Sequence, residues 1–249
     1  MLQSLYDSGA AELIYDNYWI LTVPTILGIS LFLGRKYGIK AKMLIPTVAI
    51  VFLAELVITS LLFQIPIYVR GSGVSSVVRA FIYLPFVALL CAKAFKIQWG
   101  SLCDIIAPCI CAAQGVGSSA CIFTGCCHGY PFAYGIYNPV YKMRLFPVQL
   151  CETGTSLLIA IYLIVLAMEK NYNSDGKSYP LMLMLFGMSR FMWEFFRDNT
   201  KVLWECSDVA LHSLFMIFVG AAAYMYLDRQ NKTRNSSIGF GHKGSGYHE

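Results

Sequence analysis

MLMLFGMSRFMWEFFRD, residues 182–198, is an apolar stretch with the pattern of a membrane helix, and it carries charged side chains. Arg190 and Glu194 are four residues apart, and Arg197 follows about one turn later. Residues at i and i+4 share a helix face, so Arg190 and Glu194 are expected to pair. Charged side chains in a bilayer usually face the bundle interior and mark a functional site. The alternative is an interhelical salt bridge that only holds the bundle together.

The composition of the whole chain predicts a membrane protein. Its 249 residues are 57% hydrophobic and 13% charged, with a mean hydropathy of +0.58, which is too apolar for a soluble domain of this length. The candidate spans are residues 18–34, 43–63, 79–95, 102–123, 148–168, 179–196 and 209–227. We therefore expect an all-α polytopic membrane protein with about seven transmembrane helices in one domain, residues 1–230. The polar, Gly/Ser-rich residues 231–249 are expected to form a disordered cytoplasmic tail.

The distribution of Lys and Arg predicts the orientation of the spans. One side of the predicted bundle collects Arg35, Lys36, Lys40, Lys42, Lys93, Lys96, Lys170, Lys177, Arg229, Lys232, Arg234 and Lys243. This side is expected to be cytoplasmic, with the N-terminus outside and the C-terminus in the cytoplasm. Residues 1–17 carry acids and no cation before the first apolar run, so no cleavable signal peptide is expected. The net charge of +5 is a topology signal, and no nucleic-acid partner is expected because no basic stripe interleaves with aromatics.

The segment from Gly115 to Glu152 is the second candidate for a functional region. It is rich in Gly, Pro and Tyr, contains His128, and returns to the membrane through Arg144 and Gln149. Polar residues that re-enter a bilayer beside a Gly-rich loop predict a site at the membrane interface. An ordinary connecting loop with incidental polar residues is the alternative.

Three motifs follow one another along the chain. They are CIFTGCCHG at residues 121–129, then Arg144, Pro147, Gln149, Leu150 and Glu152, and then Gly187, Arg190, Phe191, Glu194, Phe195, Phe196 and Arg197. Their order resembles the prolipoprotein diacylglyceryl transferase family, particularly its shorter members. The likeness covers roughly residues 68–226, and the last motif is the most specific.

The resemblance implies a reaction, its partners and a cellular location. Members of the family transfer the diacylglyceryl group of phosphatidylglycerol to the lipobox cysteine thiol in the signal peptide of a prolipoprotein, forming a thioether and releasing glycerol phosphate. The expected partners are therefore phosphatidylglycerol, other membrane lipid and a prolipoprotein. The expected location is the cytoplasmic (inner) membrane of a bacterium, as a multi-pass enzyme. No metal and no organic cofactor are expected.

The resemblance also implies roles for residues of the three motifs. Arginine holds a phosphate in bidentate geometry, and the departing charge needs cations. Arg190 is expected to be catalytic with Glu194 orienting it, and His128 is the candidate base for the thiol. The expected substrate-binding residues are Arg144, Gln149, Glu152, Arg197, Gly125 and Cys121. Gln149 and Glu152 would bind the glycerol hydroxyls or order the loop.

The chain departs from the family pattern at several positions. Ser118 stands where the family has an arginine, and Phe146 where it has a histidine. The histidine motif of the longer enzymes has no counterpart in residues 68–73. Arg70 or Arg79 is a candidate to supply the lost cation. We expect an enzyme; the alternatives are a divergent transferase or hydrolase with another donor or acceptor, and a non-catalytic relative that binds lipid or lipoprotein.

The nine cysteines have four interpretations: a metal site, a disulfide, packing as small apolar residues, and a thiol that covalently carries lipid as an intermediate. The cysteines are Cys91, Cys103, Cys109, Cys111, Cys121, Cys126, Cys127, Cys151 and Cys206. A metal site is disfavoured because the spacing contains no CxxC pair, and a disulfide between outer-side cysteines is an alternative. Packing as small apolar residues in helices is favoured.

Overall fold

Seven long helices make up most of the molecule. The computed structural model describes residues 9–64, 74–138, 140–169, 176–197, 201–203 and 206–241. A short helix, α2 (Ala10–Asp16), comes first. The long helices are α3 (Trp19–Lys36), α4 (Ala41–Gln64), α5 (Val74–Phe95), α6 (Trp99–Thr124), α7 (Val148–Met168), α8 (Ser178–Glu194) and α9 (Asp208–Gly241).

Each predicted span coincides with one long helix. Five apolar segments have the length and hydropathy of a membrane span, and Phe81–Phe95 of α5 is a shorter apolar helix. The five are Ala10–Lys36, Ala41–Ile58, Trp99–Thr124, Val148–Met168 and Val209–Thr233. The prediction of an all-α polytopic membrane protein is therefore confirmed.

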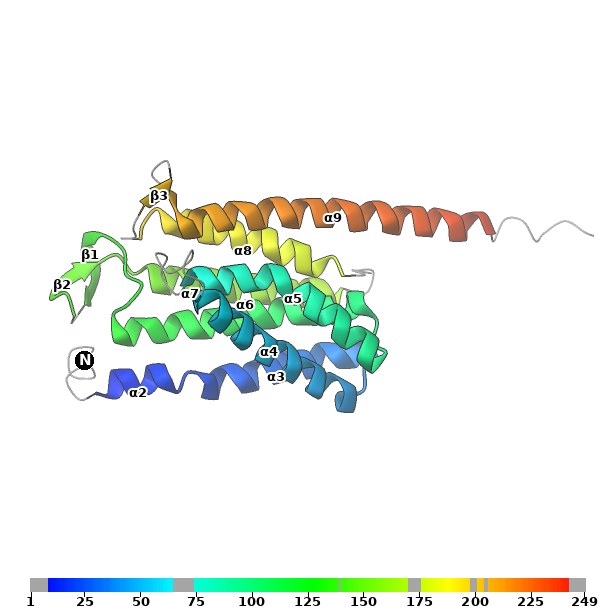
Figure 1. The fold of residues 1–249 in the computed structure, drawn as a ribbon, viewed down its shortest axis with the longest axis horizontal. Coiled ribbons are helices and arrows are strands. Elements are labelled where there is room, and N and C mark those ends of the chain that lie inside the picture. Colours follow the sequence, from blue (N-terminus) through cyan, green and yellow to red (C-terminus); the bar gives the residue numbers. More distant parts are fainter. Residues whose placement is uncertain are drawn as a thin grey trace, which may run out of the picture.

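The helices lie roughly side by side along the long axis of the molecule, with α6 at the centre (Figure 1). α6 contacts α2, α3, α5, α7 and α8, and most of its length is buried. Small residues allow this close packing. A Cβ atom on Gly115 would lie 2.9 Å from Cγ of Leu157 on α7, so glycine is needed there. The fourth predicted span, the least typical in sequence, is thus the helix around which the others assemble.

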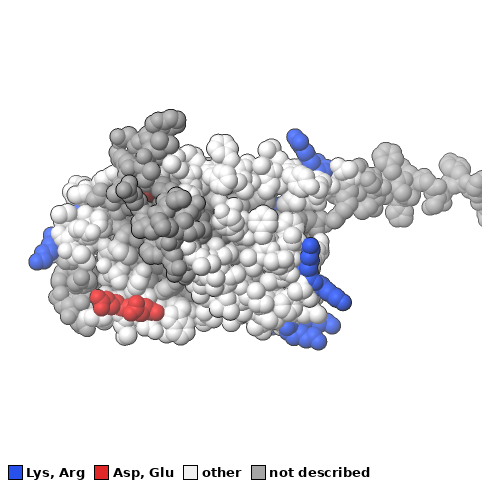
Figure 2. All heavy atoms as spheres, viewed as in Figure 1, with Lys and Arg blue, Asp and Glu red and all other residues white. Residues whose placement is uncertain are grey.

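Charged side chains gather at the two ends of the bundle. In the view of Figure 2, Lys and Arg lie mainly at the end where α9 leaves the bundle, an acidic group lies beside α2, and the face between them carries no described charge. The exposed side chains at the basic end include Arg35, Lys36, Lys40, Lys42, Lys93 and Lys96. This pattern fits a bilayer around the middle of the bundle.

Asp104 ties α6 to the start of α8. Its buried carboxylate accepts hydrogen bonds from the backbone N–H groups of Gly176 and Ser178, each at 3.0 Å. The N–H of Ser178 lies in the first turn of α8 and has no partner within the helix, and a carboxylate at a helix N-terminus also meets the favourable end of the helix dipole. The carboxylate therefore helps to fix the position of α8.

Two short antiparallel pairs of strands interrupt the helices. β1 (Pro131–Asn138) pairs with β2 (Met143–Leu145), and β3 (Lys201–Leu203) pairs with β4 (Cys206–Ser207). Both pairs lie at the end of the bundle opposite the exit of α9 (Figure 1). An isolated bridge joins Gly129 to Arg197, which connects the two loop regions. The sequence analysis assigned no strands here.

The structure differs from the prediction at the C-terminal tail. α9 continues as a helix through Gly241, whereas residues 231–249 were expected to be disordered. The helix is already nucleated by its apolar part, and adding one residue to an existing helix costs little. Lys232 also pairs with Asp228 one turn earlier, at 2.8 Å. Residues 242–249 lie outside the described part of the chain.

Candidate active site

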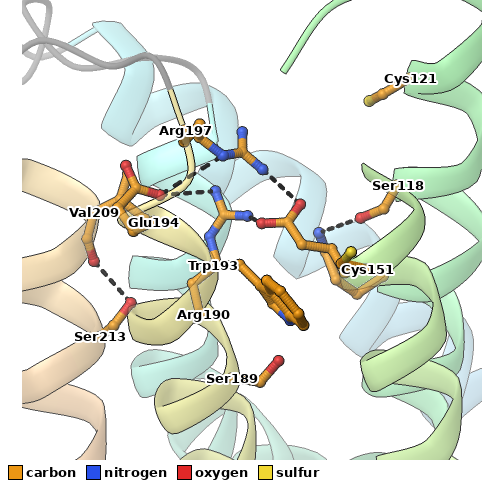
Figure 3. Close-up of polar contacts among 12 residues, drawn as sticks. Ser118, Cys121, Cys151, Ser189, Arg190, Trp193, Glu194, Arg197, Val209 and Ser213 are labelled. Carbon is orange, nitrogen blue, oxygen red and sulfur yellow. Dashed lines mark hydrogen bonds and ion pairs between the residues drawn. The ribbon is translucent and has the colours of Figure 1, made fainter. Parts of the chain in front are cut away.

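Two buried arginines and two buried glutamates form what we call the charge cluster. Arg190 and Glu194 come from the last turns of α8, Arg197 from the turn that follows, and Glu152 from the first turns of α7. Each is less than 8% exposed. Figure 3 shows the two guanidinium groups pointing toward one another, with the carboxylate of Glu194 beside them. The formal charges of the four side chains cancel.

Glu152 holds both arginines. Its Oε1 atom pairs with Nη1 of Arg190, and its Oε2 atom accepts a hydrogen bond of 2.6 Å from Nη2 of Arg197. Glu194 is a more distant partner: its Oε2 atom lies 3.9 Å from Nη2 of Arg190 and 3.7 Å from Nε of Arg197. The predicted Arg190–Glu194 pair is confirmed, but the closer partner of Arg190 comes from another helix.

Ser207 hydrogen-bonds the other carboxylate oxygen of Glu194, and this contact was not predicted from the sequence. Its hydroxyl donates a hydrogen bond of 2.7 Å to Oε1 of Glu194 and accepts one of 3.1 Å from the N–H of Ala210. Ser207 therefore caps α9 and fixes Glu194 at once. The sequence does contain a pattern that could have predicted this cap, because Ser207-Asp208 precedes an apolar run and Ser-Asp is a common helix start.

The other predicted site residues lie around the β1–β2 hairpin. Arg144 is exposed on β2 and donates a hydrogen bond of 3.1 Å to the carbonyl of Gly135. Nδ1 of His128 lies 3.1 Å from the carbonyl of Gly129, and its ring meets Tyr141 edge-on. Gln149 donates a hydrogen bond to the carbonyl of Cys126. The structure thus brings Arg190, Glu194, Arg197 and Glu152 together, and places Arg144 and His128 in a neighbouring region.

The remaining predicted residues, Cys121 and Gly125, lie at the end of α6 beside two further cysteines. The Sγ atoms of Cys121, Cys126 and Cys127 all lie within 4.8 Å of one another, and we call these residues the thiol cluster. Hydrogen bonds from the other two thiols, with the charge of Arg197, hold the pKa of Cys127 well below its usual range. The interpretation of the cysteines as small packing residues stays a prediction, but these three lie together.

A small cavity touches the charge cluster, and a larger cavity shares one lining residue with the small one. The smaller one, about 10 Å³, is lined by Arg190, Glu152 and Gln114, among others. The larger one, about 210 Å³, is mainly apolar and lies among α3, α4, α5 and α6; Gln114 and Glu55 line it as well. Gln114 is thus shared by both cavities. Gln114 could have been predicted as a site residue from the sequence, because a lone amide side chain in an apolar membrane helix often marks a functional site.

Comparison with known proteins identifies the family. The sequence profile described as prolipoprotein diacylglyceryl transferase matches residues 48–226, which is most of the chain. The chain belongs to this family. The resemblance read from the three motifs is therefore confirmed.

Individual members of the family are distant relatives. The chain is 28% identical over 141 residues to the phosphatidylglycerol–prolipoprotein diacylglyceryl transferase of Clostridium tetani, which covers 52% of this chain and 54% of that protein. It is 26% identical over 119 residues to phosphatidylglycerol–prolipoprotein diacylglyceryl transferase 2 of Clostridium perfringens, a match that covers 45% of this chain and 46% of that protein. It is also 26% identical over 141 residues to the enzyme of Dehalococcoides mccartyi, with 53% of this chain and 54% of that protein covered. The chain spans about half the length of the curated relatives it matches.

Ser118 is the residue predicted from the sequence to stand where the family has an arginine. It is buried on α6, and its hydroxyl accepts a hydrogen bond of 3.3 Å from Nε2 of Gln114 (Figure 3). The two cations predicted to compensate for the lost arginine, Arg70 and the side chain of Arg79, lie outside the described residues. Arg190 and Arg197 are the buried arginines among the described side chains.

Proposed function

We propose that this protein transfers the diacylglyceryl group of phosphatidylglycerol to the lipobox cysteine of a prolipoprotein in the bacterial cytoplasmic membrane. The observation that carries the proposal is the buried pair Arg190 and Arg197, held by two carboxylates beside an apolar cavity. Family membership and the names of the relatives support the same activity.

The charge cluster suits the phosphate of the donor lipid. Two guanidiniums offer several N–H donors in fixed positions, which matches the bidentate geometry of a phosphate. A phosphate that enters would take over contacts now made by Glu152 and Glu194. The apolar cavity reaches the cluster through Gln114 and has the lining expected for acyl chains. The head group would then lie at the arginines and the chains among α3, α4, α5 and α6.

The bonds that form and break in the transfer reaction suggest a role for each side chain of the proposed site. The sulfur of the acceptor cysteine attacks the glycerol carbon of the donor, the carbon–sulfur bond forms, and the carbon–oxygen bond to phosphate breaks. The electron pair leaves with glycerol phosphate, whose charge Arg190 and Arg197 stabilise. We propose Glu194 as the residue that orients Arg190, and His128 as the acceptor of the thiol proton. Arg144, Gln149, Glu152, Gly125 and Cys121 are proposed substrate contacts.

The test is transfer by the purified full chain in phosphatidylglycerol liposomes. A lipobox peptide and its Cys→Ala counterpart are added, and the mass of the diacylglyceryl group is followed on the peptide. We expect thiol-dependent addition that Arg190→Ala reduces by about 100-fold or more, the usual cost of removing a group that stabilises developing charge. Arg35→Ala, an exposed arginine at the other end of the bundle, is the matched control and should keep full activity.

Ser118 motivates the alternative functions. Water-dependent release of glycerol phosphate without peptide modification would favour a hydrolase. Arg190-dependent retention of phosphatidylglycerol without turnover would favour a binding-only relative. Either result would contradict the transferase, and Ser118→Arg would then test whether the residue at this position is the cause.

A further inference from the structure

The thiol cluster lies directly beside the charge cluster, and the mechanism above gives Cys126 and Cys127 no task and names only Cys121 as a substrate contact. Its three cysteines, spaced C-x4-C-C, occupy the last turn of α6 and the turn that follows. Cys127 lies next to the guanidinium of Arg197. The hydroxyl of Thr124 donates a hydrogen bond of 3.2 Å to Sγ of Cys126. Three half-buried thiols therefore meet at the edge of the proposed active site.

The backbone is bent to bring these sulfurs together. Gly125 ends α6 in the left-handed region, at φ 69°, and Cys127 adopts φ 57°, which is uncommon for a residue with a side chain. Asn138 and Gln149 hold this turn by donating hydrogen bonds to the carbonyls of Gly125 and Cys126. Strained residues that their surroundings hold in place cluster at functional sites. The arrangement is thus fixed from outside and does not depend on the thiols alone.

The spacing of the three sulfurs suits one thiophilic metal ion. Tetrahedral zinc with bonds of about 2.3 Å to sulfur requires sulfur atoms about 3.8 Å apart. The Sγ atoms all lie within 4.8 Å of one another, which is close to this spacing. A disulfide would use two of the three sulfurs, whereas a metal ion uses all of them. Three thiolates on a divalent ion leave one negative charge, which Arg197 can balance.

We propose that Cys121, Cys126 and Cys127 bind one zinc ion, or a similar thiophilic divalent ion, and leave its fourth position open to the thiol of the acceptor peptide. Three protein ligands with one open position are typical of catalytic zinc, while structural zinc has four. A thiol that coordinates such an ion loses its proton outright.

The role in catalysis rests on the proposed function. With the ion bound, the acceptor thiol would be acidified, and its proton would pass to His128, the proton acceptor proposed above. The bound sulfur then attacks the glycerol carbon of the donor, and the carbon–oxygen bond breaks with its electron pair on the phosphate oxygen. The thioether product is neutral and a weaker ligand than thiolate, so it leaves the ion.

The first experiment measures metal binding by the purified full chain. The protein is reduced, stripped of metal and titrated with Co²⁺ in detergent. We expect one equivalent to bind with thiolate-to-cobalt charge-transfer absorption. Replacing Cys121, Cys126 or Cys127 by Ser should weaken cobalt binding by at least roughly 100-fold. Loss of a residue that only hydrogen-bonds a metal ligand can already cost that much, and these residues are the ligands themselves. Cys151→Ser, a half-buried cysteine on α7 outside the thiol cluster, should bind as the unchanged protein does.

The second experiment adds the acceptor. A lipobox peptide should change the cobalt absorption, and its Cys→Ser counterpart should not. Absence of the charge-transfer band in well-folded protein would overturn the site, as would a disulfide within the thiol cluster in protein purified without reductant. Circular dichroism shows whether each variant is folded.

The outcomes separate this inference from the proposed function. Full transfer by the metal-free protein would refute the metal role and leave the transferase intact. Cobalt binding and a peptide response without any transfer would support the site and refute the transferase.

Discussion

Glu152 is the residue on which the charge cluster depends, because its one carboxylate contacts both buried arginines. Replacing it by Gln leaves two guanidiniums with only the more distant carboxylate of Glu194. Removing one partner from a buried ion pair typically costs about 3–5 kcal/mol. We expect Glu152→Gln to lower the free energy of unfolding by that order, measured by SDS titration in mixed micelles.

A double-mutant cycle checks that the loss comes from this contact. Arg197→Gln removes the guanidinium that hydrogen-bonds Glu152 at 2.6 Å, so the two changes should be non-additive by about 0.5–3 kcal/mol. Glu12→Gln, an exposed carboxylate on α2, is the control and should change stability little. Additive effects of the two substitutions would show that Glu152 and Arg197 do not stabilise one another.

At the residue scale, the sequence predicted contacts within one helix and missed those between helices. Arg190 and Glu194 were paired correctly because the i, i+4 relation follows from helix geometry alone. The contacts of Glu152 depend on how α7 and α8 pack, which no local pattern encodes. The thiol cluster was missed for a similar reason, because the left-handed turn at Gly125 and Cys127 brings its sulfurs together.

At the scale of the elements, α8 and α9 form a close pair that glycine makes possible. A Cβ atom on Gly187 would lie 2.9 Å from the carbonyl oxygen of Ser213 and 3.0 Å from Cγ1 of Ile217. Gly187→Ala should push the helices apart and cost about 1–3 kcal/mol, as overpacking does. Since Arg190 lies one turn further along α8, transfer should fall as well. Thermal unfolding and the liposome assay measure the two effects.

Gly154 on α7 provides the control for this substitution. A Cβ atom there meets no other group within 4 Å. Gly154→Ala should leave stability unchanged or raise it by up to about 1 kcal/mol, because alanine has the higher helix propensity. Equal effects of Ala at both positions would contradict the close packing of α8 and α9.

The seven long helices of the described residues were predictable because each contains an apolar segment bounded by charges or turn residues. The hairpin β1–β2 was not, since its strand residues lie in a segment rich in Gly, Pro and Tyr that reads as a loop. The extent of α9 was also missed, because composition alone favours disorder after residue 230. There the structure continues a helix that the membrane-spanning part has already nucleated.

At the scale of the whole molecule, the charge distribution assigns a side of the membrane to each end of the bundle. The basic end holds the connections α3–α4 and α5–α6 and the exit of α9, while α2 and both strand pairs lie at the opposite end (Figures 1 and 2). Lys and Arg near short loops are retained in the cytoplasm. The charge cluster and the thiol cluster would then open toward the outer side, where a translocated lipobox cysteine arrives.

This orientation predicts the behaviour of topology reporters in cells. A green fluorescent protein fused to the C-terminus should fluoresce, because it folds in the cytoplasm, and alkaline phosphatase there should be inactive. An epitope inserted at Tyr134, which is 90% exposed on β1, should be accessible to antibody from the outer side of spheroplasts. An epitope in the connection between Lys36 and Lys40 should be accessible only after permeabilisation. The reverse pattern would place the arginines at the cytoplasmic face, away from any translocated acceptor, and would contradict both the predicted topology and the proposed transfer.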